Sequence, residues 1–229
     1  MGAAVEFTRP DGKTAPGYLA QAPHPERAPG IVMFEEWWGV DDRIKATADR
    51  LAEHGFNVLV ADLFRGRSAA TGDEANHLMQ GLDFGDAATQ DGAGAAQYLR
   101  DHGAPRVGVI GFCMGGALAM LCLMHGVKFD SASIWYGNPP AGAGDPNNIG
   151  VPIQGHFALR DAFFAIEDVD ALEAKLKAAG APYEFHRYDA EHGFYNTGKL
   201  GEGGLGHYHP EHAETAWRRT LEFFDRTLR

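Results

Sequence analysis

Residues 106–125 read RVGVIGFCMGGALAMLCLMH, and this stretch decides the fold that we expect. An apolar strand ends in Gly111, a lone Cys113 follows, and Gly115 and Gly116 open a helix that is apolar nearly all round. A helix without a polar face is typical of a buried element. Small residues on both sides of a reactive side chain allow a sharp turn between a strand and a helix. Such a turn holds a nucleophile at the edge of a sheet.

Apolar strands and helices alternate along the rest of the chain. The predicted strands lie within 3–23, where a turn at 10–12 joins two of them, and within 30–39, 57–64, 131–137, 151–159 and 183–189; the predicted helices lie within 41–54, 71–100, 164–179 and 210–227. This alternation predicts an α/β fold with a mostly parallel sheet covered by helices on both faces. No linker or repeat interrupts the pattern, so we expect one domain over residues 1–229.

The composition excludes several classes of protein. The 229 residues carry a formal net charge of −11, and no stretch has the clustered Lys and Arg that a nucleic-acid partner requires. No run is apolar enough to span a membrane, and Glu6 and Arg9 interrupt the start where a signal peptide would be apolar. Cys113 and Cys122 lie too far apart on one predicted helix to bond. We therefore expect a cytoplasmic protein, a monomer or small homo-oligomer, without nucleic-acid or membrane partners.

A cysteine nucleophile needs a base and an orienting acid, which follow it along the chain in the order acid, His. Asp161 comes directly after one predicted strand, and His192 lies in the loop after the next. Asp161 could instead cap the helix that follows it, and Asp189 is an alternative acid. Cys113 could also be a buried structural thiol, which is the interpretation that fits Cys122.

The chain resembles the dienelactone hydrolase family of α/β-hydrolases over nearly its whole length. The motifs that carry the resemblance are GFCMGG around Cys113, EEWWGV around Glu36, HFALRD with Asp161, AEHGF with His192, and ADLF at 61–64, where the family has PDLY. The resemblance implies the α/β-hydrolase fold, a three-layer sandwich. It also implies carboxymethylenebutenolidase-type hydrolysis of a lactone or ester, with Cys113 as the nucleophile and Asp161 and His192 as its triad partners.

The resemblance also gives Glu36 a function, because in the family the resting thiol bonds this carboxylate and is inert until substrate displaces it. A carboxylate beside a thiol can take its proton, and a thiol kept uncharged until substrate arrives resists oxidation. Glu35 is the neighbouring alternative, whereas Glu36 matches the family's register before Trp37. The backbone N–H groups of Met114 and Trp37 would form the oxyanion hole.

Two arginines that bind the substrate carboxylate in the family are missing from this chain. The sequence has Asn76 and His77 at one position, and Tyr195 and Asn196 at the other. Because a bidentate arginine clamp is a strong and geometry-specific contact, its loss makes a dienelactone an unexpected substrate. The basic residues that could substitute are Arg65, Arg67 and Lys199.

Aromatic side chains near predicted strand ends are expected to form an apolar pocket in place of the clamp, and such a pocket suits a neutral ester or lactone. The residues predicted to bind substrate are Trp38, Phe64, Trp135, Tyr136, Phe194 and Tyr195. Trp37, Phe163 and Phe164 also lie near strand ends, and we expect half of all these aromatic residues to belong to the core.

The remaining signals are weaker. His207, His209 and His212 form a His-rich cluster, but Pro210 interrupts it and no ligand geometry is fixed, so we expect no metal and no cofactor. Residues 196–210 predict a Gly-rich surface loop. The expected function is therefore a Cys-dependent hydrolase of a lactone or small ester. An acyltransferase or thioesterase on the same triad, and a non-catalytic ligand-binding protein, stay open as alternatives.

Overall fold

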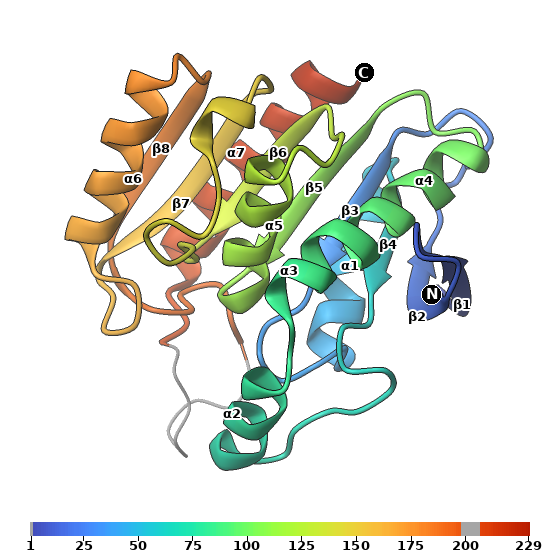
Figure 1. The fold of residues 1–229 in the computed structure, drawn as a ribbon, viewed down its shortest axis with the longest axis horizontal. Helices are drawn as coiled ribbons and strands as arrows, with labels where there is room; N and C mark the ends of the chain where they lie inside the picture. The colour runs from blue at the N-terminus through green and yellow to red at the C-terminus, as the bar shows by residue number, and fades with distance from the viewer. Residues whose placement is uncertain (1, 198–206) are drawn as a thin grey trace.

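The computed structural model describes residues 2–197 and 207–229 (Figure 1). In these residues one sheet has the strand order β1-β2-β4-β3-β5-β6-β7-β8. The first two strands form an antiparallel hairpin, β2 pairs antiparallel with β4, and every pair from β4 to β8 is parallel. The strands are β1 (Ala3–Thr8), β2 (Thr14–Ala20), β3 (Gly30–Phe34), β4 (Asn57–Ala61), β5 (Val107–Phe112), β6 (Ser131–Trp135), β7 (Ile153–Arg160) and β8 (Tyr183–Glu191). The predicted mostly parallel sheet is confirmed.

Helices cover both faces of this sheet. In Figure 1, α4, α5 and α6 lie on the near face and α1 and α7 on the far face, and a separate buried cluster fills each interface. The helices are α1 (Asp42–Glu53), α2 (Gly72–Gln80), α3 (Phe84–Asp86), the π-helix η1 (Ala87–Gly92), α4 (Ala93–Asp101), α5 (Met114–Met124), the 3-10 helix η2 (Pro146–Asn148), α6 (Ile166–Ala178) and α7 (Pro210–Leu228). No helix among the described residues is both long and apolar enough to cross a membrane.

The predicted helical region 71–100 is divided rather than continuous. Thr71 and Glu74 cap the start of α2 through reciprocal hydrogen bonds of 3.3 Å. The helix ends at Gln80, and Asp83 starts a new helical run by accepting a hydrogen bond from the Asp86 N–H at 3.0 Å. A second set of capping residues thus starts a second helix.

The Gly-rich surface loop is predicted over residues 196–210. Residues 198–206 of that loop lie outside the described residues.

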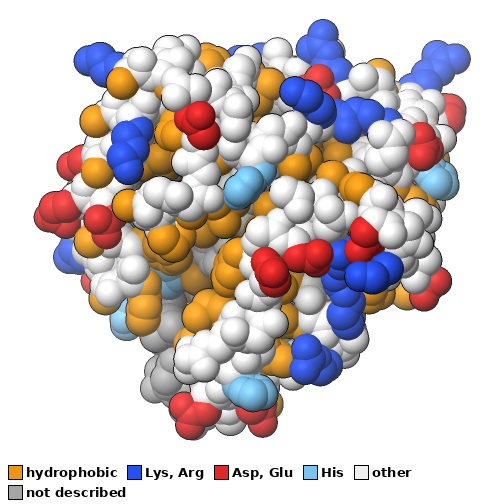
Figure 2. All heavy atoms as spheres, viewed as in Figure 1, with side chains coloured by type: hydrophobic (Ala, Val, Ile, Leu, Met, Phe, Trp, Pro, Cys, Tyr) orange, Lys and Arg blue, Asp and Glu red, His pale blue; other side chains and the backbone are white. Residues whose placement is uncertain are grey.

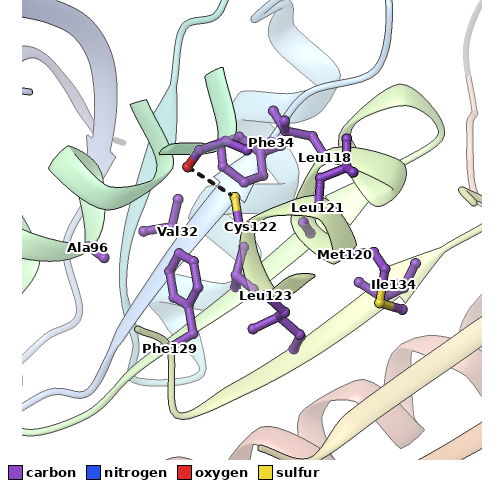
Figure 3. Close-up of a cluster of buried hydrophobic side chains, with 14 of the residues drawn as sticks. Val32, Phe34, Ala96, Leu118, Met120, Leu121, Cys122, Leu123, Phe129 and Ile134 are labelled. Carbon is purple, nitrogen blue, oxygen red and sulfur yellow. Dashed lines mark hydrogen bonds between the residues drawn. The ribbon is translucent and has the colours of Figure 1, made fainter. Parts of the chain in front are cut away.

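The helix α5 is buried along its whole length, as its apolar sequence predicts. Figure 3 shows its side chains, among them Leu118 and Cys122, packed against Phe34 and Phe129. Cys122 is fully buried and donates to the Ala88 carbonyl at 3.5 Å, and burial raises the pKa of its thiol. A buried protonated thiol is unreactive, so Cys122 is the structural cysteine that the sequence predicts.

Candidate active site

Cys113 occupies a strained turn between β5 and α5. Its backbone has a positive φ (φ 55°, ψ −118°), and its N–H donates to the Trp135 carbonyl at 2.9 Å. A Cβ at Gly111 would lie 2.0 Å from the Gly115 carbonyl oxygen, and one at Gly115 would lie 2.5 Å from the Phe34 carbonyl oxygen. Only glycine fits at these two positions, which explains the small residues on either side of the cysteine. Strain of this kind persists where the surrounding structure enforces it, and it clusters at functional sites.

Three side chains from separate strand ends meet at this turn. His192, after β8, places its Nε2 3.1 Å from Cys113 Sγ, and its Nδ1 lies 2.7 Å from Oδ2 of Asp161, after β7. The His192 and Asp161 side chains are only 5% and 2% exposed, while Cys113 is partly exposed. The structure thus brings together the three residues that the sequence predicts. A nucleophile, a base and an orienting acid at these distances can carry out acyl transfer.

The surroundings of His192 favour its charged form. Burial alone would lower the pKa of the ring, but the electrostatic interaction with Cys113 and the hydrogen bonds to Asp161 and Cys113 outweigh it. The pKa of His192 rises to about 10 as a result. An imidazolium that stays protonated at neutral pH is the partner that a thiolate nucleophile needs.

Asp161 makes further hydrogen bonds besides the one to His192. Its Oδ1 accepts hydrogen bonds from the N–H groups of Phe163 at 2.8 Å and Phe164 at 2.9 Å, which shapes the turn before α6. It does not cap α6, because the residue at that cap is Ala165. The alternative acid, Asp189, has a side chain that is 74% exposed and paired with Arg160. Asp161 therefore fits the position of the acid, and Asp189 does not.

The first turn of α5 packs directly on the end of β3, where the oxyanion hole is predicted. The first intrahelical bond of α5 is donated by the Ala117 N–H to the Cys113 carbonyl at 3.1 Å, so the Met114 N–H precedes the bonded part of the helix. A Cβ at Gly115 would lie 2.5 Å from the Glu35 carbonyl oxygen, which brings the backbone leading to Trp37 against the same turn. The Met114 and Trp37 N–H groups stay the predicted donors.

Glu36 is buried near the triad but has partners other than the thiol. Its Oε1 accepts from the Tyr136 hydroxyl at 3.3 Å, and its Oε2 accepts from Asn196 Nδ2 at 2.6 Å. Burial raises the pKa of Glu36, and the positive charges of Arg43 and His192 oppose that rise. The resting thiol–Glu36 contact that the family resemblance implies is therefore not the arrangement in this structure, where the sulfur faces His192.

Glu35 lies in a different environment from its neighbour. It is fully buried, its Oε1 accepts from the Leu63 N–H at 2.9 Å, and its Oε2 has no hydrogen-bond partner among the described residues. Burial raises the pKa of Glu35 well above its usual value, and the nearby negative charges of Asp62 and Asp91 add to the rise. Glu36, and not Glu35, is thus the carboxylate near the triad.

This geometry agrees with comparisons to known proteins. The model of the dienelactone hydrolase family matches residues 15–228. The chain belongs to the dienelactone hydrolase family. Among its relatives, protein usf of Aquifex pyrophilus is 31% identical over 238 residues, covering 100% of both chains. A carboxymethylenebutenolidase of Rhodococcus opacus is 28% identical over 242 residues, covering 98% of this chain and 92% of that one.

Solved structures show the same fold at lower identity. A dienelactone hydrolase-like promiscuous phosphotriesterase from metagenomic libraries has a TM-score of 0.83 at 23% identity, and the match covers 100% of this chain and 99% of that one. The α/β-hydrolase fold is therefore confirmed. Membership of the dienelactone hydrolase family makes this protein a hydrolase of ester bonds.

The described basic residues that could replace the family's arginine clamp are committed elsewhere. Arg65 Nη2 binds both oxygens of Asp91, at 2.8 and 2.9 Å, and Arg67 Nε donates to the Phe64 carbonyl at 3.1 Å. Lys199 lies outside the described residues. Arg65 is thus bound to Asp91, whereas Arg67 is exposed and lines a cavity other than the one beside Glu36.

The predicted His-rich cluster has a structural role where it is described. His209 caps α7 by accepting from the His212 N–H, and the two rings stack with centroids 4.0 Å apart. Within residues 2–197 and 207–229, no group of three or more His, Cys, Asp or Glu side chains could hold a metal ion.

The aromatic residues predicted to bind substrate divide into two groups. Phe64, Trp135 and Phe194 pack in the core and do not line the cavity beside Glu36, and Trp38 packs against Ala69 and Ala75. Tyr136 and Tyr195 line a cavity of about 350 Å³, together with Glu36, Arg43 and Asn196. The direction of a side chain at a strand end decides between core and pocket, and the sequence pattern does not give that direction.

A second cavity lies beside the base. Phe163 and Phe164 place their rings 5.2 and 5.6 Å from the His192 ring and line a cavity of about 480 Å³ with Asn138, between α6 and the loop after β6. Figure 2 shows a hollow with largely hydrophobic walls on the face that carries α5 and α6. Phe163 is 50% exposed, so part of its ring is open to solvent beside this cavity.

Two residues of the site have roles that the sequence analysis missed. Asn196 binds Glu36, and the Arg43 guanidinium binds the other end of the Asn196 amide. In the sequence, Arg43 is one more charged residue in the first turn of an amphipathic helix, and Asn196 only marks the place of an absent arginine. No pattern in the sequence joins them, because their contact depends on the tertiary fold.

Proposed function

We propose that this member of the dienelactone hydrolase family hydrolyses a lactone or small carboxylic ester through a Cys113–His192–Asp161 triad and a covalent acyl-enzyme. The observation that carries the proposal is the continuous hydrogen-bonded chain from Cys113 Sγ to His192 Nε2 at 3.1 Å and from His192 Nδ1 to Asp161 at 2.7 Å. The partial exposure of the thiol, on a turn whose glycines are sterically required, supports it.

The mechanism follows from the position of each group. The Cys113 thiolate attacks the ester carbonyl carbon and forms a C–S bond, and the carbonyl oxygen becomes an oxyanion that the Met114 and Trp37 N–H groups would stabilise. As the oxyanion collapses, the C–O bond to the leaving group breaks and the His192 imidazolium gives its proton to the departing alkoxide. His192 then takes a proton from water, whose hydroxide attacks the thioester, and the C–S bond breaks to release the acid and the thiolate. Asp161 holds the ring in the tautomer that both steps need.

We infer that the preferred substrates are neutral. The described alternatives to the missing clamp are bound to other protein groups, and Phe163 and Phe164 form an apolar wall beside His192. Matched esters with and without a free carboxylate on the acyl part test this inference, and the neutral member of each pair is expected to have the higher kcat/KM. A preference for the acidic member would overturn it.

The experiment that tests the triad combines kinetics with trapping. Cys113→Ala is expected to lose at least about 10⁴-fold in kcat on p-nitrophenyl esters, by analogy with the loss of a nucleophile in other hydrolases. Cys113→Ser, which makes a more stable ester intermediate, is expected to gain the mass of the acyl group by intact mass spectrometry. Undiminished turnover in Cys113→Ala would refute the mechanism. A product that forms only when an alcohol or thiol acceptor is added would instead favour an acyltransferase.

We also infer that the protein works in the cytoplasm. Both cysteines are free in the structure, and one of them is the proposed nucleophile. A reducing compartment keeps such a thiol available for reaction.

A further inference from the structure

A series of hydrogen-bonded polar groups connects Glu36 to the start of α1. We call this series, formed by Tyr136, Glu36, Asn196, Arg43 and Asp41, the relay. Asn196 Nδ2 donates to Glu36 Oε2 at 2.6 Å, and Asn196 Oδ1 accepts from Arg43 Nη1. Arg43 Nε donates to Asp41 Oδ2 at 3.0 Å. On the other side of the carboxylate, the Tyr136 hydroxyl donates to Glu36 Oε1 at 3.3 Å. Each contact in the relay joins a donor to an acceptor.

The chemistry of these groups fixes the direction of the chain. A guanidinium has only donors, so Arg43 can meet only the oxygen of the Asn196 amide. The amide NH₂ must then face Glu36, and Glu36 must accept. Since the Tyr136 hydroxyl also donates to it, Glu36 is placed as a double acceptor, which is the bonding of an ionised carboxylate. The relay therefore sets both the charge and the orientation of Glu36.

Both ends of the relay are held in place by backbone hydrogen bonds. Asp41 caps α1, and its Oδ1 accepts from the N–H groups of Arg43 at 3.0 Å and Ile44 at 3.1 Å. The Asn196 N–H donates to the Gly193 carbonyl at 2.8 Å, which places Asn196 one tight turn after His192. A displacement of Arg43 would therefore be felt at Glu36 through an amide that has little freedom to compensate.

The charges around Glu36 show why this anchoring matters. Burial raises the pKa of Glu36; the charges of Arg43 and His192 lower it, that of Asp41 raises it, and the Tyr136 hydrogen bond lowers it. Arg43 is the cation that the first turn of α1 supplies, and His192 is needed for chemistry. Arg43 is thus the positive charge available to stabilise Glu36 without taking part in proton transfer.

We propose that Arg43 and Asn196 are positioning residues that keep the Glu36 carboxylate ionised and bound away from the Cys113 sulfur, so that His192 alone exchanges a proton with the thiol. The inference rests on the proposed role of Cys113 as nucleophile. Without the relay, Glu36 is free to take up a proton or to accept the thiol S–H, and either change weakens the Cys113–His192 pair. In this protein the relay is built from an asparagine four residues after His192 and from a cation that α1 supplies.

A double-mutant cycle on thiol reactivity tests the relay. The second-order rate constant for iodoacetamide modification is measured from pH 5.5 to 9 in the wild type, R43Q, E36Q and R43Q/E36Q. Since Cys122 is fully buried, modification of the folded protein reports on Cys113. We expect R43Q to slow modification near pH 7 by about tenfold, which corresponds to one pKa unit, and to have less than about a twofold effect when E36Q is already present. N196A is expected to act in the same direction while leaving Arg43 and the α1 cap in place.

The matched control is R50Q. Arg50 lines the same cavity and lies on the same helix, but it binds Glu214 and stacks over Trp217, so its loss is expected to leave the alkylation profile unchanged. Equal slowing by R43Q in both Glu36 backgrounds, or no slowing by either R43Q or N196A, would overturn the relay. Iodoacetamide needs no ester turnover, so a wild-type protein that alkylates as expected but hydrolyses no ester would contradict the proposed function and not the relay.

Discussion

Replacement of Asp161 with Asn is expected to reverse the hydrogen bonding of His192 while leaving the fold intact. Asp161 Oδ1 accepts from two backbone N–H groups, those of Phe163 and Phe164, and Oδ2 accepts from His192 Nδ1. In the variant the amide oxygen must stay with the two N–H groups. Turning the amide round would set its NH₂ against both donors and break both hydrogen bonds, at about 0.5–1.5 kcal/mol each.

The new NH₂ group therefore faces His192 Nδ1, which must become an acceptor. The ring proton then lies on Nε2 and points at the Cys113 sulfur, so the ring cannot accept the thiol proton. The corresponding change in a serine protease lowers kcat by about 10⁴. Because a thiol ionises far more readily than a hydroxyl, we expect a smaller loss here, of about 10³ in kcat, or about 4 kcal/mol at 1.4 kcal/mol per tenfold.

The assay is kcat on a p-nitrophenyl ester, together with the iodoacetamide rate at pH 7 and the free energy of unfolding in urea. The unfolding free energy is expected to change by less than about 1 kcal/mol, since the turn keeps both of its hydrogen bonds. Asp189→Asn is the matched control: it alters an exposed carboxylate three residues from His192, and its activity is expected to match the wild type. If Asp161→Asn kept more than a tenth of the wild-type kcat, the orienting role of Asp161 would be wrong.

Three further outcomes follow from the packing. The Gly111→Ala variant is expected to lose at least about 3 kcal/mol of unfolding free energy, because its Cβ would lie 2.0 Å from a carbonyl oxygen. Gly150→Ala is the control, and it is expected to lose little because its Cβ would meet nothing within 4 Å. Urea titration measures the unfolding free energy of both variants. Burial lowers the pKa of His156 well below its usual value, so the unfolded chain binds a proton that the folded chain refuses. The contribution of His156 to stability is expected to be fully present above about pH 6.5 and to fall by up to about 2 kcal/mol by pH 5, and the fall is expected to be smaller in His156→Gln. Iodoacetamide is expected to add one label to the folded protein, at Cys113, and a second, at Cys122, only after unfolding, as mass spectrometry can count.

Much of the fold could be predicted because its determinants are local. The alternation of apolar strands and helices, the capping aspartates and Gly55 after α1, with φ of +102°, each leave a mark in a short window of sequence. The division of region 71–100 was not predicted, although its second cap, Asp83, is visible in the sequence. Helical periodicity on both sides of a three-residue break resembles one helix, and the Asp83 cap marks the boundary in the structure.

The triad could be predicted for a related reason. In a parallel sheet the carboxyl ends of neighbouring strands meet at one edge, so residues directly after β5, β7 and β8 must lie close together. The pocket could not be predicted in the same way. Trp135 and Tyr136 are consecutive, yet Trp135 packs in the core while the Tyr136 hydroxyl reaches Glu36. Both rings belong to the same buried cluster, and Tyr136 follows the strand with a positive φ of 35°, a local backbone conformation that the pattern of aromatic residues does not reveal.

The missing arginine and the relay have one physical origin. Where the sequence has Asn196 in place of an arginine, the site loses a cation that could bind both Glu36 and a substrate carboxylate. Arg43 restores the charge beside Glu36, but from α1, where Asp41 and the Asn196 amide already occupy its donors. A substrate carboxylate could recruit Arg43 only by breaking those contacts and leaving Glu36 buried without its counter-charge, which costs several kcal/mol. The same exchange that stabilises Glu36 therefore disfavours acidic substrates, and R43Q, which removes this cation altogether, is expected to slow thiol modification while keeping the preference for neutral esters.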